Sequence, residues 1–324
     1  MRKVVPIMLL AVMVAGGIYL ALVRAHREPG ITGPVMSVRF LDESLGNAIV
    51  VRTPERGTVV IDPPSGREAD ALGRMLRDER VREITVIVPN PASGFDGLGG
   101  YASGQKASRS IVPQASGQKA SQSIGAQASG EKASRSIVVT RLVRPELGSA
   151  TQDWEKRLAK LGGAPIAENV VARGDVLKLS KTVRIQVLGP DRATAQSALR
   201  QAQDDGSLVF RLVYGGKSFL FPTDMRAKGE AELVKSGGEL GSSVLVAGRH
   251  GQYPSTSLEL LSMARPEIVV ISAKRGASRP SAAVLERLSP SSTGAALYRT
   301  DKDGIIRIDT DGHTIRVSTE GGEP

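Results

Sequence analysis

The residues best placed for chemistry follow an apolar strand, in the stretch VIVPNPASGFDGLGG at residues 86–100. A strand that runs into a loop rich in Pro, Gly and Ser is typical of an active site, because side chains at the strand's carboxyl end can reach a ligand. This loop supplies only Asn90, Ser93 and Asp96, with no His, Glu, Lys or Arg. The stretch therefore predicts a functional site by position but offers little that could carry a reaction.

Two further candidates follow apolar segments later in the chain. Asp224 comes after SFLFPT and His250 after VLVAGR. Asp96 and Asp224 would make a carboxylate pair for general acid–base work, and Ser93 or Ser255 beside His250 would pair a nucleophile with a base. The spacing along the chain fixes none of these distances, so both arrangements stay open.

Two other polar residues are expected to have structural roles. Asp62 ends an apolar strand, and we expect it to hydrogen-bond the turn that follows. His313 follows Asp311-Gly312, which predicts a hairpin turn, and we expect its side chain to be exposed.

Composition excludes several classes of site. The 324 residues include no Cys and three His, so disulfides and thiolate metal sites are excluded and imidazole ligands are scarce. Aromatic residues make up 3% of the chain, which predicts an aliphatic core. The net charge of +10 suits a polyanionic partner, but an arginine-rich composition explains it equally well.

The N-terminus predicts a membrane anchor. Residues 4–23 form an uncharged apolar run, and a helix of about 20 residues reaches across a bilayer core. A cleaved signal peptide is the alternative, although the small-residue site at residues 23–25 contains an Arg. We expect an anchor with its flank at residues 1–27, a linker at 28–34, and an extracytoplasmic domain beyond it.

The remainder of the chain predicts an α/β (α+β) domain with two sheets flanked by helices. Alternating and β-branched runs indicate strands, Gly215-Gly216 indicates a hairpin turn, and an apolar stripe indicates a helix at residues 68–80. Expected strands lie at 35–41, 47–53, 57–62, 85–89, 183–190, 207–214, 217–224, 242–248 and 266–272, and further helices at 227–236, near Ser257, and at 282–288.

A tandem repeat interrupts this pattern at residues 102–139. Three nearly identical copies begin at residues 102, 115 and 128, and each carries one Ile as its main apolar residue. Such copies bury little apolar surface, which predicts a flexible insertion. A basic arm is the alternative, with five basic residues against one acidic residue, but it has no aromatic residue for stacking on bases.

Four segments, in this order, resemble the metallo-β-lactamase fold. They are residues 40–62, 212–224, 244–272 and 279–288. More narrowly, they resemble the soluble hydrolase-like domain of the ComEC family of DNA-internalisation competence proteins. The resemblance implies a four-layer α/β-β/α sandwich over residues 35–318, interrupted by the repeats and followed by a tail at 319–324.

Some positions of the family's motifs are kept and others are replaced. In the opening turn, Asp42, Gly46 and Ala48 fit the family pattern, while Leu45 and Asn47 replace Gln and Asp. The later motifs keep Asp224 and His250 at an acidic and an imidazole position, and place Arg249 and Arg279 where the family has His.

The resemblance also implies that the metal-ligand loop has lost its ligands. The family's H-x-H-x-D-H motif falls on Asn90, Ala92, Gly94 and Phe95. We therefore expect no metal cofactor, because an open catalytic site needs about three protein ligands. One ion held by Asp224 and His250 remains an alternative, and zinc or manganese would be the cofactor of an active enzyme.

Two functions remain open. The first is a non-catalytic binding or scaffold module linked to DNA uptake, with DNA or another anion as its ligand. Arg249, Arg275 and Arg279 would bind the anion, because guanidinium pairs well with phosphate. The alternative is that these three arginines are solvated surface residues. The second is an active nuclease or phosphoesterase with an atypical site. The expected binding residues are Asn90, Asp96, Arg249, Arg275 and Arg279.

Overall fold

The computed structural model describes residues 30–90, 137–146, 154–156, 158, 166–195, 206–276 and 278–321. The expected anchor and the repeats as far as residue 136 lie outside these ranges, so neither prediction is tested. Within the described ranges, no helix combines the length and apolar character needed to cross a membrane.

The first sheet has eight strands and mixed direction. Neighbouring strands pair antiparallel from β15 to β3, and parallel from β3 to β6. In spatial order its strands are β15 (Ile315–Gly321), β14 (Gly304–Thr310), β1 (Met36–Phe40), β2 (Ile49–Arg52), β3 (Thr58–Ile61), β4 (Glu83–Ile87), β5 (Val138–Arg144) and β6 (Ala167–Val170).

The second sheet has seven strands and repeats this change of direction. Strands β7 to β10 pair antiparallel, and β10 to β13 pair parallel. In spatial order they are β13 (Ala296–Arg299), β12 (Ile268–Ile271), β11 (Val244–Val246), β10 (Lys217–Phe221), β9 (Val209–Tyr214), β8 (Val183–Gly189) and β7 (Val176–Lys178).

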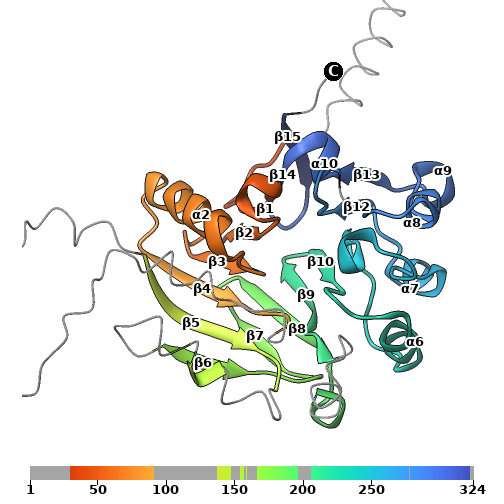
Figure 1. Cartoon of the computed structure of the whole chain (residues 1–324), viewed down its shortest axis with the longest axis horizontal. Helices are drawn as coiled ribbons and strands as arrows, with labels where there is room; N and C mark the ends of the chain where they lie inside the picture. Colours follow the sequence, from red (N-terminus) through yellow and green to blue (C-terminus); the bar gives the residue numbers. More distant parts are fainter. Residues whose placement is uncertain are drawn as a thin grey trace, which may run out of the picture.

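Helices cover the outer face of each sheet, which makes an α/β two-sheet sandwich (Figure 1). Leu72 and Leu76 of α2 (Gly66–Asp78) pack in one buried cluster with Val60 and Val86 of the first sheet. Buried side chains of the helices that follow β10 form another cluster with the second sheet. These helices are α6 (Ala227–Lys235), α7 (Leu258–Ala264) and α8 (Ala282–Arg287), with the short α9 (Pro290–Thr293) and α10 (Thr300–Asp303) nearby in the chain.

The largest buried cluster lies between the two sheets. It joins Val38, Phe40 and Ile61 of the first sheet to Phe210 and Phe221 of the second, and most of its other members are Val, Ile or Leu. The Phe210 and Phe221 rings stack with their centroids 4.8 Å apart. Burial of these inner faces holds the ends of β3 and β10 against each other.

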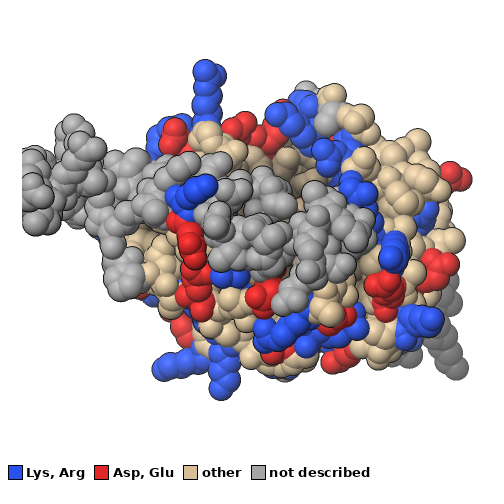
Figure 2. All heavy atoms as spheres, turned by 60° about the horizontal axis from the view of Figure 1, so that its bottom comes forward, with Lys and Arg blue, Asp and Glu red and all other residues tan. Residues whose placement is uncertain are grey.

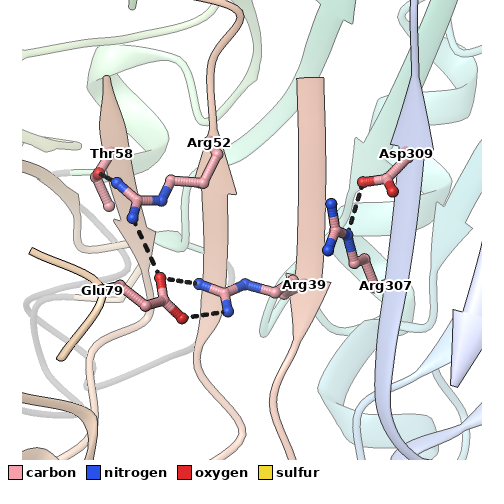
Figure 3. Close-up of polar contacts among 6 residues, drawn as sticks. All are labelled: Arg39, Arg52, Thr58, Glu79, Arg307 and Asp309. Atoms are coloured by element: carbon pink, nitrogen blue, oxygen red, sulfur yellow. Dashed lines mark hydrogen bonds and ion pairs between the residues drawn. The ribbon is translucent and has the colours of Figure 1, made fainter. Parts of the chain in front are cut away.

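A network of ion pairs fastens the end of α2 to the first sheet (Figure 3). Glu79, the residue after α2, accepts hydrogen bonds from Arg39 on β1 at 2.5 and 2.8 Å and from Arg52 on β2 at 3.2 Å. Burial alone would raise the pKa of Glu79, but the hydrogen bonds and charges of the two arginines outweigh it and hold this pKa below its usual range. Beside this network, Arg307 pairs with Asp309 along β14.

Most expected elements are confirmed. The hairpins around residues 53–57, 215–216 and 311–314 form, and Ser257 caps α7 by accepting a hydrogen bond from the Leu260 backbone N–H. Strands β5, β6, β7 and β13 were not expected. Strand β5 begins within the third repeat copy, at Val138, and β6 and β7 are edge strands of four and three residues, too short for alternation to be detected.

Replacing Phe210 by Ala should destabilise the protein by about 3 to 5 kcal/mol, because it opens a cavity between the sheets. Urea unfolding followed by circular dichroism measures this change in the free energy of unfolding. The matched control is Val176→Ala, since Val176 is 59% exposed on β7 and its truncation should change stability by about 0.5 kcal/mol or less. A cost below about 1 kcal/mol for Phe210→Ala would contradict the packing described here.

Candidate functional site

Polar residues gather where strands of both sheets end. Asp62 follows β3, Asp224 follows β10 after two residues, and Ser272 follows β12 directly. His250 follows β11 within the 3-10 turn η6 (Gly248–Gly251). Since the inner faces of the sheets pack together, these strand ends converge on one cleft.

The cleft has an inner and an outer part that share Asn47, Asp62, Asp224 and His250. The inner part encloses about 50 Å³ between mostly apolar walls and also contacts Arg249. The outer part is wider, at about 370 Å³, and its other polar side chains are Glu43, Ser65, Glu68 and Lys274. Acidic groups therefore outnumber basic groups in the outer part of the cleft.

Asn90 contacts the site through Asp224. Its side chain is buried, and its Nδ2 donates a hydrogen bond to Asp224 Oδ2 at 3.2 Å. The amide thus presents an N–H to the Asp224 carboxylate. A metal ligand in this place would have to present a lone pair instead.

Asp62 lies between two charged groups in the cleft. Burial and the neighbouring Asp224 carboxylate raise the pKa of Asp62 to about 6, and the charge of His250 opposes this rise. No described residue hydrogen-bonds the Asp62 side chain. The expectation that Asp62 bonds its own turn was therefore wrong, since its carboxyl group faces the cleft instead.

The turn that presents His250 has an unusual backbone. Arg249 and His250 both have positive φ, at 51° and 57°, and the Arg249 N–H donates to the Thr223 carbonyl at 2.7 Å. Gly251 has φ of 75°, and a Cβ there would lie 2.6 Å from Pro280 Cβ, so this position requires glycine. Strain of this kind persists where the surrounding structure enforces it.

A hydrogen bond fixes the tautomer of His250. Its Nδ1 lies 2.8 Å from the Ser272 carbonyl oxygen. Because a carbonyl oxygen only accepts, Nδ1 carries the proton, and in the neutral ring Nε2 is left as an acceptor.

A buried carboxylate holds the loop that follows. Glu230 of α6 is fully buried and accepts hydrogen bonds from the Thr256 and Ser257 N–H groups at 2.6 and 2.8 Å. Burial raises the pKa of Glu230, although these bonds and the charge of Arg287 oppose the rise. Arg287 also donates to the Ser255 and Thr256 carbonyl groups, so charged groups hold this loop on two sides.

The other expected site residues are spread more widely. Arg275 and Arg279 are exposed and are not among the residues that line the cleft, whereas Arg249 is. The Ser255 hydroxyl donates to the Gly248 and Gln252 carbonyl groups, which ties it to its own loop. His313 is exposed, as expected. Outside the described residues lie Ala92, Ser93, Gly94, Phe95 and Asp96.

Among the described residues, the donor set does not fit a two-metal centre. Within the described ranges, no group of three or more His, Asp or Glu side chains is arranged to hold a metal ion. The cleft combines four carboxylates and one imidazole with the amide of Asn47, and Asn90 adds an amide N–H that is bonded to Asp224. Such groups can bind a ligand by hydrogen bonds and charge.

Two sheets packed face to face, outer helices and a cleft at the strand ends define the metallo-β-lactamase fold. The chain is also distantly homologous to two competence proteins. It is 30% identical over 171 residues to ComE operon protein 3 of Bacillus subtilis (strain 168), covering 52% of this chain and 21% of that protein. It is 38% identical over 116 residues to competence protein ComA of Neisseria gonorrhoeae, covering 35% of this chain and 16% of that protein.

Other comparisons give weaker likenesses. The chain is 8% identical, with a TM-score of 0.33, to Zn²⁺-bound PqqB from Methylobacterium extorquens, covering 62% of this chain and 56% of that one. The identity is also 8% and the TM-score 0.33 for a Thermotoga maritima protein whose structure is described as that of a putative Zn-dependent hydrolase of the metallo-β-lactamase superfamily. This likeness covers 82% of this chain and 99% of that one. No protein-family model matches the chain.

Replacing Asp62 by Asn should flatten the pH dependence of stability between about pH 4 and pH 6. Because the pKa of Asp62 is raised in the folded protein, folding favours its protonated carboxyl group. The stability that comes from the protonated group is fully present below about pH 4 and is lost as the pH rises through about 6. At pH 7.5 the variant should be more stable than the wild type by about 1 to 3 kcal/mol, and near pH 4 the two should be alike.

Urea unfolding at several pH values measures this difference. Asp70→Asn, which replaces an exposed carboxylate on α2, is the matched control. If the difference in stability between Asp62→Asn and the wild type stays constant across this pH range, the pKa of Asp62 is not raised in the folded protein.

Proposed function

We propose that this chain is a non-catalytic binding module with a metallo-β-lactamase fold, which acts in competence and is linked to DNA uptake. It would be anchored by residues 4–23, with its domain outside the cytoplasmic membrane. The observation that carries the non-catalytic part is the hydrogen bond from Asn90 Nδ2 to Asp224 Oδ2. An amide that donates to this carboxylate stabilises the site without an ion.

The chemistry of the cleft supports this proposal. Metal-dependent hydrolysis needs an ion to lower the pKa of a bound water and to stabilise the charge that develops on the substrate. Burial and the Asp224 carboxylate instead raise the affinity of Asp62 for a proton, because an apolar environment and a neighbouring negative charge both disfavour ionisation. His250 is the one imidazole that lines the described cleft.

The link to competence rests on homology. The chain spans 21% and 16% of the two competence proteins it matches, so their activities as whole proteins come to this chain only as a proposal. Charge alone does not identify DNA as the ligand. Figure 2 shows Lys and Arg interspersed with Asp and Glu on the face it presents, rather than one continuous basic surface.

An active nuclease or phosphoesterase is the second candidate. The retained Asp224 and His250 and the cleft at the strand ends favour it, and zinc or manganese would then be the cofactor. The donor set of the described residues speaks against it.

Metal content separates the two candidates. The full-length chain, purified in mild detergent, is incubated with zinc or manganese, freed of excess metal and analysed by plasma mass spectrometry. We expect less than about 0.1 equivalent of bound metal per chain, because a catalytic site needs about three protein ligands. A parallel assay with radiolabelled DNA and manganese should show no cleavage.

A variant with a restored ligand motif provides the matched control. It combines Asn90→His, Ala92→His, Gly94→Asp and Phe95→His, and it should retain more metal than the wild type under the same conditions. Between one and two equivalents in the wild type, together with DNA cleavage that Asp224→Ala abolishes, would contradict the non-catalytic proposal and support the hydrolase.

A further inference from the structure

A second concave site lies on the helical face of the second sheet, away from the cleft. It is a groove of about 410 Å³ between α7, α8 and α9, the three helices that lie close together in Figure 1. We define this helix groove by Leu258, Arg265, Pro266, Arg287, Ser292 and Thr293. Its volume falls within the range of about 300 to 1,000 Å³ that is usual for small-ligand pockets.

The charge of the helix groove has one sign. Two arginines line it, and none of the described residues that line it is acidic. The Arg265 side chain is exposed, and it makes no hydrogen bond or ion pair with any described residue. Arg287 is held in place by its two hydrogen bonds from Nη1 to the Ser255 and Thr256 carbonyl groups, which leaves its Nε and Nη2 free of these bonds.

Exposed apolar side chains lie next to these cations. Tyr253 is 59% exposed and Leu258 is 65% exposed. The Arg287 guanidinium carbon lies 6.0 Å from the centre of the Tyr253 ring, at the limit of a cation–π contact. An aromatic ring, an aliphatic wall and two arginines therefore occupy one surface.

We propose that the helix groove binds a nucleotide unit of single-stranded DNA. Its phosphate would pair with Arg265 and Arg287, because the planar guanidinium matches phosphate oxygens in a bidentate manner. Its base would lie against Tyr253 and Leu258, since aromatic stacking accepts any base. A flat lipid surface fits less well, because the two arginines line a concave site. The choice of DNA rests on the proposed link to DNA uptake, whereas the site itself is independent of whether the cleft is catalytic.

Fluorescence anisotropy tests the proposal with the full-length chain in mild detergent. The probe is a labelled oligothymidylate of about 15 nucleotides at about 50 mM salt. We expect Arg265→Glu to weaken binding by about tenfold or more, and Tyr253→Ala by about five- to tenfold. Tyr253→Phe keeps the ring and should bind within about twofold of the wild type.

Matched controls separate a site from general charge. Arg74→Glu reverses an exposed arginine on α2 and should change the affinity by about twofold or less. Equal losses in Arg74→Glu and Arg265→Glu would overturn the proposal. So would unchanged binding in both Arg265→Glu and Tyr253→Ala, or a loss confined to the double variant Arg249→Ala/Arg279→Ala.

Two further probes identify the source of the nucleotide. If the natural ligand is a DNA strand, thymidine monophosphate should displace the oligonucleotide only at a much higher concentration. Displacement at equal concentration would assign the helix groove to a free nucleotide and would overturn the proposal that it binds a DNA strand. Vesicles containing phosphatidylglycerol provide the lipid comparison. Vesicle binding that Arg265→Glu and Tyr253→Ala abolish, with DNA binding unaffected, would overturn the proposal in favour of a membrane surface.

Discussion

Burial of the two inner sheet faces against each other is the interaction on which the candidate site depends. Val38, Phe40 and Ile61 on one side and Phe210 and Phe221 on the other lose nearly all contact with solvent. Apolar burial of this extent is a dominant favourable contribution to folding. It fixes the ends of β3 and β10, and therefore places Asp62 and Asp224 in one cleft although their charges repel each other.

The fold followed from the sequence where local signals agreed with the tertiary structure. Gly215-Gly216, the Ser257 cap and the apolar stripe of α2 each act within a few residues, so they can be detected before any packing is known. Strands β6 and β7 carry no such signal. Their sequences AENV and VLK become strands through pairing with neighbours that are distant in sequence.

The site was less predictable than the fold. Asp224 and His250 were expected, and the structure brings them together with Asp62, which sequence reasoning had assigned to a turn. The sequence held one signal that Asp62 belongs to the site. Asp62 follows an apolar strand directly, and Asp224 follows another after two residues. Charge repulsion between two carboxylates depends on their distance, which no pattern along the chain supplies. No pattern along the chain shows how far a side chain lies from the cleft. For the same reason, the sequence did not predict that Arg275 and Arg279 lie outside the lining of the cleft.

One loop connects the cleft to the helix groove. Residues 248–257 begin with the strained turn that presents Arg249 and His250, continue through Tyr253, and end at the backbone groups held by Glu230 and Arg287. Glu230 supplies a buried negative charge, and Arg287 partly balances it while it lines the helix groove. A ligand that neutralises Arg287 would weaken this balance. Because Glu230 holds the backbone that follows His250, the occupancy of one surface would then affect the geometry of the other, without any need for catalysis in either.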